Sequence, residues 1–213
     1  MSATTVAALF VEESGVYANL PDVEAWGITR DARRYTGPHP VVCHSPCERW
    51  GRYWSGGPSA KTPRKLGDDD GCFASALASV RKWGGVLEHP EASHAWRHHQ
   101  LIAPLRGGGW SLADDRGGWT CCVEQGAYGH RARKATWLYA FGVKLPVLRW
   151  RARGDFVRLD AEHHSAEERA RAIKTGACQR LSKRQRAATP VEFRDVLIAI
   201  ARSARSVQRM ECR

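Results

Sequence analysis

The residues of greatest chemical interest are a cysteine and a glutamate that each follow a short apolar segment. Cys47 lies in the stretch VVCHSPCERWGRYW at 41–54, and Glu88 lies in GGVLEHP at 84–90. A cysteine thiolate can attack an electron-poor ring carbon when positive or dipolar surroundings lower the pKa of the thiol. A half-buried carboxylic acid can hold the proton that activates such a ring at its nitrogen. Together the two residues predict nucleophilic attack on a nitrogen heterocycle.

Two other interpretations of these residues are open. A lone cysteine is more often a buried small hydrophobe, and a lone glutamate is more often a surface charge. Zinc binding is the second alternative, because Cys43, His44 and Cys47 lie close together and four histidines follow at 89, 94, 98 and 99. A structural zinc site usually needs paired ligands such as CxxC, and the chain has none. The adjacent Cys121 and Cys122 would point to opposite faces of a strand. We therefore expect no metal.

The elements that must position Cys47 and Glu88 follow the order of an α/β sheet. Apolar runs predict strands within 6–15, 39–47, 86–90 and 133–143. The segment 72–85 predicts a helix, because Asp68–Asp70 precede it and Gly84-Gly85 end it. In open parallel sheets, ligand sites lie at the carboxyl ends of the strands. Cys47 and Glu88 both stand at such ends, so we expect them to meet across one pocket.

The C-terminal part of the chain divides into a basic segment and a helix. Residues 151–186 hold ten Arg and Lys against five Asp and Glu, with few core residues. Residues 189–204 predict a helix with a capping box of Thr189 and Glu192, Pro190 at its first position, and one apolar face. That face comprises Phe193, Val196, Leu197 and Ile200. We divide the chain into a catalytic core at 1–150, a basic segment at 151–186 and a C-terminal helix, 187–213, packing back on the core.

Composition and charge favour a soluble protein with a polyanionic partner. The chain has 213 residues, 43% of them hydrophobic, and a net charge of +11. The first 50 residues carry −2, so residues 51–213 carry +13, either to bind nucleic acid or only to aid solubility. Nine tryptophans near basic residues suit base stacking. Seven cysteines without a framework pattern indicate free thiols. No apolar run approaches a membrane span and no secretory leader is present, so we expect an intracellular protein.

Four blocks in order resemble the DNA cytosine-5 methyltransferases, particularly the small divergent enzymes of phage and prophage genomes. HSPCERW (44–50) is similar to the Pro-Cys block that carries the attacking cysteine. GGVLEHP resembles the block with Glu-Asn-Val or Glu-Asn-Pro, and EHPEASHAW continues it as the phage forms do. EQGAYGHRARKATWLYAFG (124–142) is similar to the late block with a Tyr-Gly pair before basic residues and a strand. RAATPVEFRDVLIAIA (186–201) resembles the closing block, and the matches together span 39–204.

This resemblance implies a Rossmann-like methyltransferase fold with a mostly parallel sheet and a shortened cofactor half. The target cytosine would be flipped out of the DNA duplex. Cys47 would add to C6, Glu88 would bind the N3 edge, and C5 would accept a methyl group from S-adenosylmethionine. Arg131 and Arg133 would orient the base or its phosphate. The resemblance places the protein in the cytoplasm of a bacterial host.

The resemblance also assigns DNA and cofactor contacts. The loop 51–68 would close over DNA as a lid. The residues expected to bind DNA are Arg49, Arg52, Lys61, Arg64, Lys65, Lys134, Lys183 and Arg184. S-adenosylmethionine would contact Phe10, Glu12 and Gly15, with Asp31 reading the adenine ring and Glu12 or Glu24 holding the ribose.

The chain departs from the family pattern in several places. ALFVEESG has one glycine where the family has a glycine-rich turn, and only 36 residues separate Phe10 from Cys47. SPCE replaces the usual Pro-Pro-Cys-Gln, and His89 replaces the Asn after Glu88. Two alternatives therefore stay open. One is an enzyme that uses a different one-carbon donor or a nucleotide substrate, and the other is a DNA-binding relative without catalysis.

Overall fold

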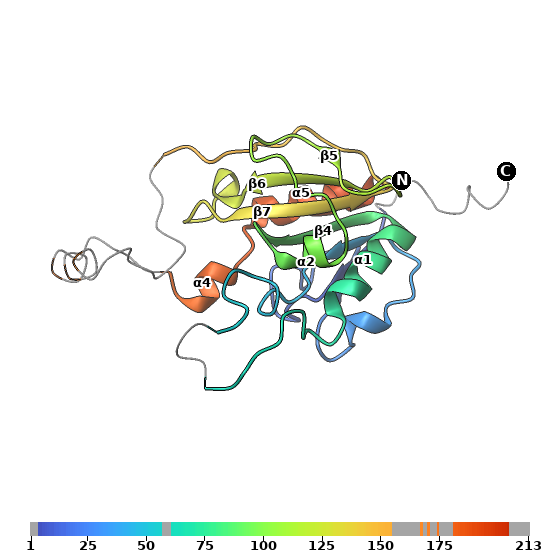
Figure 1. Ribbon diagram of the computed structural model, residues 1–213. Helices are drawn as coiled ribbons and strands as arrows, with labels where there is room; N and C mark the ends of the chain where they lie inside the picture. The colour runs from blue at the N-terminus through green and yellow to red at the C-terminus, as the bar shows by residue number, and fades with distance from the viewer. Residues whose placement is uncertain are drawn as a thin grey trace.

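The chain is built around one mixed β-sheet. A computed structural model describes residues 4–56, 61–154 and 181–204, with the single positions 167, 170 and 174. Within this part, seven strands form a sheet in the order β2-β1-β3-β4-β7-β6-β5 (Figure 1). The strands are β1 Val6–Leu9, β2 Val23–Trp26, β3 Val41–Cys43, β4 Gly85–Pro90, β5 Ser111–Leu112, β6 Trp119–Glu124 and β7 Ala135–Phe141.

The expected mostly parallel sheet is wrong for half of the strand pairs. β1 pairs in parallel with β2 and β3, and β3 pairs in parallel with β4. The pairs β4–β7, β6–β7 and β5–β6 are antiparallel. The connection from β6 to β7 spans only residues 125–134, too short for the crossover that parallel neighbours need. The fold is therefore α/β with a sheet that is only partly parallel.

The predicted helix between β3 and β4 is confirmed as α1, Cys72–Trp83. The Asp69 carboxylate accepts hydrogen bonds from the backbone N–H groups of Gly71 and Phe73 at 3.1 and 2.8 Å, so it satisfies donors at the start of the helix. Gly84 ends the helix with φ 74, a conformation that favours glycine. Within 4–56, 61–154 and 181–204, the other helices are α2 His94–His98, α4 Lys183–Ala187 and α5 Val191–Arg202, and short 3-10 turns are η1 Ala32–Arg34 and η2 Gln125–Tyr128.

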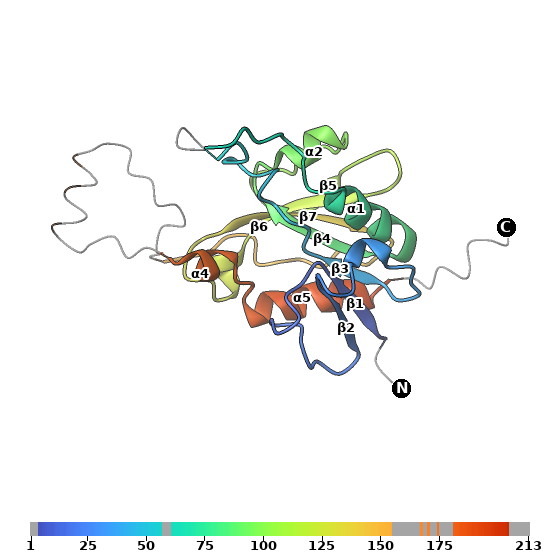
Figure 2. The same ribbon diagram turned by 90° about the horizontal axis from the view of Figure 1, so that it is seen from below.

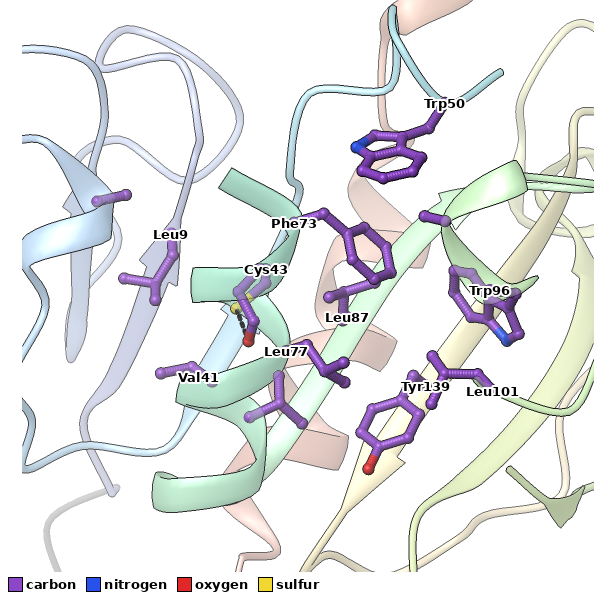
Figure 3. Packing of buried hydrophobic residues seen from close by; sticks show 14 of the residues in the cluster. Leu9, Val41, Cys43, Trp50, Phe73, Leu77, Leu87, Trp96, Leu101 and Tyr139 are labelled. Carbon is purple, nitrogen blue, oxygen red and sulfur yellow. Dashed lines mark hydrogen bonds between the residues drawn. The ribbon is translucent and has the colours of Figure 1, made fainter. Parts of the chain in front are cut away.

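Two apolar layers cover the sheet, one on each face (Figure 2). The α1 face buries Phe73, Leu77 and Val80, and Figure 3 shows this cluster continuing to Trp50, Trp96 and Tyr139. Alternate residues of each strand face opposite layers, as Leu9 and Ala8 of β1 do. The buried face of α5 contains Phe193, Leu197 and Ile200, with Val196 partly buried beside them, as predicted.

The predicted capping box at the start of α5 is wrong. Pro190 occupies the N-cap position of this helix, and no side chain caps it. Glu192 forms an ion pair with Arg149 instead, which commits its carboxylate to the segment after β7. The capping box lies one helix earlier, between Ser182 and Gln185 of α4.

The strand order reverses at β1, and this reversal indicates the edge of the sheet at which a ligand is expected to bind. The chain passes from β1 to β2 on one side, then returns to β3 on the other side, with η1 between. Between β1 and β3 the chain forms no α-helix, which agrees with a shortened first half. In open α/β sheets, ligands bind outside the carboxyl ends of the strands where the order reverses. That edge carries Phe10, His44 and Glu88.

No helix among the described residues is long and apolar enough to cross a membrane.

Candidate active site

The parallel register of β3 and β4 brings the two predicted catalytic residues to one edge of the sheet. Cys43 at the end of β3 pairs with Leu87 of β4, so His44 and Glu88 are the next residues along the two strands. Cys47 follows four residues after β3, is partly buried, and lies near enough that the Glu88 charge acts on its thiol. Cys43 is a core residue: it is fully buried, and its thiol donates to the Ala76 carbonyl of α1 (Figure 3).

Both oxygens of the Glu88 carboxylate are held by side-chain donors. His44 Nδ1 lies 3.0 Å from Oε2, and Gln125 Nε2 donates to Oε1 at 3.1 Å. The Glu88 side chain is only 12% exposed. Gln125 is fully buried, and its Nε2 also donates to Thr136 Oγ1 at 2.9 Å. Residues after β3 and β6 therefore fix the carboxylate from two sides.

A tyrosine extends this chain of hydrogen bonds toward the N-terminal half. The Tyr17 hydroxyl lies 2.8 Å from His44 Nε2, and the two ring centroids are 5.3 Å apart. Tyr17 belongs to the loop between β1 and β2, which Arg194 of α5 holds by donating to the Val16 carbonyl at 2.7 Å. Burial and the Glu88 charge raise the Tyr17 pKa well above its usual range, so the phenol keeps its proton.

The structure corrects the expected charge of Glu88. Burial would raise the pKa of this carboxyl, but the hydrogen bond from His44 and the charges of His44 and Lys134 lower it to about 2. Glu88 is therefore a carboxylate near neutral pH, not the carboxylic acid predicted from the sequence. The physical reason is that two donors solvate the ion inside the protein.

The expected pKa of Cys47 is also wrong in direction. Burial, together with the Glu88 charge, raises the pKa of the Cys47 thiol. The Lys134 charge opposes this effect. The thiol is consequently protonated at rest, and its neighbour Glu88 is ionised. A thiolate can form only if another group or solvent accepts the proton.

Lys134 supplies a positive charge that acts on Cys47 and Glu88. The sequence instead predicts that Lys134 contacts DNA. Its Nζ donates to the carbonyls of Ala187 and Ala188 at 3.1 and 2.8 Å. It therefore ties the end of α4 to the segment before β7. Burial lowers the Lys134 pKa, whereas the charges of Glu88 and Cys47 raise it. His130 makes a second link, because its Nδ1 accepts from Ala132 N, which leaves Nε2 to donate to the Gln185 carbonyl at 3.1 Å.

The loop that carries Cys47 is anchored by Trp50. The Trp50 indole is 2% exposed and packs on Phe73 of α1, as Figure 3 shows. Its Nε1 donates to Asp69 Oδ2 at 2.7 Å. The Cys47 carbonyl accepts from the N–H groups of Trp50 and Gly51, which forms a tight turn directly after the cysteine. The anchor therefore fixes the position of Cys47 relative to α1.

Most of the residues expected to bind DNA are exposed around this edge. Loop 51–68 and α4 lie at the same end of the sheet but on opposite sides of it (Figures 1 and 2). Arg131 and Arg133 are exposed in the segment that leads to β7. The other exposed members are Arg52, Lys61, Arg64, Lys65 and Arg184, while Arg49 is half-buried. The Lys183 side chain, residues 57–60 of the expected lid and most of 155–180 lie outside the described residues.

The residues expected to hold S-adenosylmethionine fit this group only through Phe10 and Glu12. Phe10 directly follows β1 with φ 61, and Glu12 is exposed two residues later. The turn is tight at Gly15, where a Cβ would lie 3.0 Å from the Glu12 carbonyl oxygen. An exposed carboxylate at this strand end suits ribose hydroxyls.

The other two expected cofactor contacts are committed to partners within the protein. Both Asp31 oxygens accept from the Arg33 guanidinium, at 2.8 and 3.0 Å, so an adenine ring would have to share this carboxylate with Arg33. Glu24 Oε2 accepts from Trp26 Nε1 at 3.3 Å, and Glu24 Oε1 lies 3.5 Å from His39 Nε2.

The remaining clusters and hollows do not contain Cys47 or Glu88. Among the described residues, no group of three or more His, Cys, Asp and Glu side chains could hold a metal ion. One shallow hollow lies over α1 and is lined by Leu77, Arg81 and Arg116, and another lies between α2 and Trp137. We place the candidate active site from the hydrogen bonds and electrostatics of Glu88, because neither hollow gathers reactive groups.

Sequence reasoning missed three residues of the site. From the sequence, His44 stands out only as a possible metal ligand, and Tyr17 and Gln125 have no assigned role. The position of His44 directly after a strand that pairs with β4 could have indicated its contact with Glu88. No local signal points to Tyr17 or Gln125, since their contacts depend on distant strands.

Comparison with known proteins gives no match: no family model, no curated protein and no solved structure matches this chain.

Proposed function

We propose that the protein transfers a methyl group to C5 of cytosine in DNA. The observation that carries this proposal is the group formed by Cys47, Glu88 and Lys134 at the carboxyl edge of β3 and β4. A thiol, a fixed carboxylate and a cation are the groups needed for addition to a pyrimidine ring. The order of the sequence blocks that resemble the DNA cytosine-5 methyltransferases adds support.

Cys47 and Glu88 act on opposite edges of the flipped base. Cys47 Sγ forms a bond to C6 as its proton leaves, and the Lys134 charge favours the thiolate. The carboxylate of Glu88 has lone pairs left beyond its two bonds, so it can accept from the cytosine amino group and share a proton with N3. With N3 protonated, the electron pair from the C5–C6 double bond makes C5 nucleophilic. After C5 has gained a methyl group, it loses its hydrogen as a proton to solvent, and the Sγ–C6 bond breaks as the C5–C6 double bond forms again.

The one-carbon donor is assigned to the carboxyl ends of β1 and β2. S-adenosylmethionine would supply an electrophilic methyl group there when bound. Phe10 and Glu12 would border it, whereas Asp31 stays paired with Arg33 and Glu24 stays in contact with Trp26 and His39. Because those two acids are engaged, a different one-carbon donor is the second candidate.

DNA is the proposed substrate because the positive charge lies beside the site. Residues 51–213 carry +13, and exposed basic side chains occupy loop 51–68 and α4 at the edge that carries Cys47. Phosphate contacts of this kind position a duplex without reading its sequence.

The test is expression in a strain that lacks cytosine methylation, followed by nucleoside mass spectrometry of its DNA. We expect a cytosine one methyl heavier with the wild type and none with Cys47→Ser. Cys72→Ser is the matched control, because Cys72 is partly buried at the start of α1, outside the site. A modified cytosine with a different added mass would show that the one-carbon donor is not S-adenosylmethionine. Unmodified DNA with soluble wild-type protein would contradict the proposal.

A further inference from the structure

We propose that His44 supplies the proton that Glu88 shares with the bound base, so that Tyr17, His44 and Glu88 form a proton relay. This inference rests on the proposed function, because it concerns the same carboxylate. His44 does not contact the base in this scheme. It acts through Glu88, and Tyr17 positions its ring.

The relay stands on an unbroken chain of short contacts. Tyr17 Oη lies 2.8 Å from His44 Nε2, and His44 Nδ1 lies 3.0 Å from Glu88 Oε2. The side chains of His44 and Glu88 are 13% and 12% exposed, and Tyr17 is fully inside the α5 layer. Water therefore has little access to these atoms, and a proton that reaches Glu88 Oε2 comes most directly from His44.

The two oxygens of Glu88 differ in what they can exchange. Oε1 is held by the Gln125 amide, which donates but does not titrate near neutral pH. Oε2 is held by an imidazole, which both donates and titrates. A purely structural clamp would need only donors, as on the Gln125 side. The histidine gives the carboxylate one partner that can release its proton.

The Tyr17 hydroxyl suits both protonation states of His44. A hydroxyl can donate or accept a hydrogen bond. When the ring carries a proton on Nδ1 alone, the hydroxyl donates to Nε2. When Nε2 also carries a proton, Nε2 donates to the hydroxyl oxygen. The ring can thus gain or lose a proton without moving, provided Tyr17 stays protonated, as its raised pKa ensures.

The proton step balances without another reactant. The His44 imidazolium gives its Nδ1 proton to Glu88 Oε2, which leaves neutral imidazole with its proton on Nε2 and a neutral carboxylic acid. Glu88 then shares this proton with N3 of the base while the Cys47 thiol loses its own proton to solvent. The pair returns to imidazolium and carboxylate when N3 loses its proton at the end of the reaction.

Charges from several neighbouring elements act on this chain of contacts. His89 lies on the same strand as Glu88, and Lys134 precedes β7. The Glu88 charge acts in turn on Cys47, in the loop after β3, and Glu48 of that loop also acts on Cys47. Arg194 and Asp195 of α5 act on Tyr17, as does Cys43 of β3. Variants of the relay must therefore leave these groups unchanged.

The experiment compares His44→Asn with Gln125→Met in the full chain. The asparagine amide can still donate to Glu88 but cannot deliver a proton as a general acid. We expect His44→Asn to lower kcat by about 100-fold or more, with DNA affinity unchanged and the alkaline limb of the kcat–pH profile lost. Gln125→Met removes the donor on the other oxygen and should lower kcat while keeping that limb. Tyr35→Phe is the control for loss of a buried hydrogen bond away from the site, because it removes the hydroxyl that donates to the main-chain carbonyl of His39.

A second readout does not depend on turnover. Nitrogen NMR of histidine-labelled protein reports the charge of the His44 ring. We expect the signal of His44 Nδ1 to change in Glu88→Gln, because the carboxylate that accepts from this nitrogen is lost. Wild-type kcat and pH profile in His44→Asn would overturn the relay and leave the proposed function standing. If the wild type forms no product, the proposed function fails. Identical His44 nitrogen signals in the wild type and in Glu88→Gln would overturn the relay, whatever the outcome for the proposed function.

Discussion

His44 Nδ1 lies 3.0 Å from Glu88 Oε2, and this contact joins the strand that leads to Cys47 to the strand that carries Glu88. Since β3 and β4 are parallel neighbours in register, the histidine after one strand meets the acid of the next. The contact keeps Glu88 ionised, and the ionised Glu88 in turn raises the pKa of the Cys47 thiol. His44 therefore acts on the Cys47 thiol indirectly, because it keeps Glu88 ionised and this charge helps to keep the thiol protonated.

This coupling predicts the reactivity of Cys47. Replacing Glu88 by Gln removes a negative charge that raises the thiol pKa, so the thiolate fraction increases. We expect iodoacetamide to alkylate Cys47 about three- to tenfold faster in Glu88→Gln near neutral pH, since one pKa unit is a tenfold change in thiolate. Lys134→Met should slow the reaction. Peptide mass spectrometry resolves each cysteine, and Cys72 provides the internal control. Equal Cys47 rates in all three proteins would contradict the coupling.

A second prediction concerns stability in acid. Burial lowers the His89 pKa to about 4. Below about pH 6.5, His89 gains a proton in the unfolded chain but stays neutral in the folded protein. The free energy of unfolding therefore decreases as the pH falls from about 6.5 to 4, and this decrease ends below about pH 4. The difference between the pKa of His89 in the unfolded and folded states corresponds to a loss of about 3 kcal/mol in the free energy of unfolding. Urea unfolding at a series of pH values should show a shallower decline for His89→Asn. His94→Asn, at an exposed histidine of α2, should follow the wild type.

The anchor of the Cys47 loop gives a third prediction. Trp50→Phe keeps the ring in the apolar layer but removes the Nε1–H donor to Asp69. We expect a loss of about 1.5–3 kcal/mol in the free energy of unfolding, because the acceptor is charged. Trp54→Phe is the control in the same loop, since Trp54 is only half-buried. An unchanged urea midpoint for Trp50→Phe would show that the bond contributes nothing to stability.

The sequence predicts the individual strands and helices of this fold better than it predicts which strands pair and in which direction. Strands β1, β3, β4 and β7 and helices α1 and α5 follow from hydrophobic runs and Asp or Gly signals. The expected strand-end positions hold only in part: Cys47 comes four residues after β3, and Glu88 lies inside β4, two residues before its end. Strands β2 and β5 are too short or too polar to stand out. The antiparallel half depends on contacts between β4 and β7, whose residues are some fifty positions apart.

The charge states of the site could not be predicted from residue types. A basic loop after Cys47 indicates a low thiol pKa, yet the dominant influences are burial and Glu88. A half-buried Glu88 indicates a carboxylic acid, yet His44 and Gln125 solvate the ion. These effects come from side chains placed by the register of distant strands, and only the folded chain brings them together.

The last prediction concerns DNA affinity and its dependence on salt. Lys61, Arg64 and Lys65 are exposed on the loop beside the site, so we expect each to contact a phosphate. Binding to duplex DNA should weaken steeply with salt and depend little on sequence. Replacing all three by Ala should reduce the slope of log affinity against log salt by about 2–3, because each phosphate contact contributes about 0.9. Fluorescence anisotropy over a salt series measures this slope.

A matched variant separates local contacts from net charge. Lys82, Arg116 and Lys144 are also exposed, but they lie at the opposite end of the sheet, near the start of β4 and β6 and after β7. Replacing these three by Ala changes the net charge by the same amount. If phosphates bind at loop 51–68, this control keeps the wild-type slope, and only the loop variant loses it. Equal reductions of the salt slope in the two variants would show that DNA affinity depends on the overall charge of the protein. Loop 51–68 would then not be the phosphate-binding site.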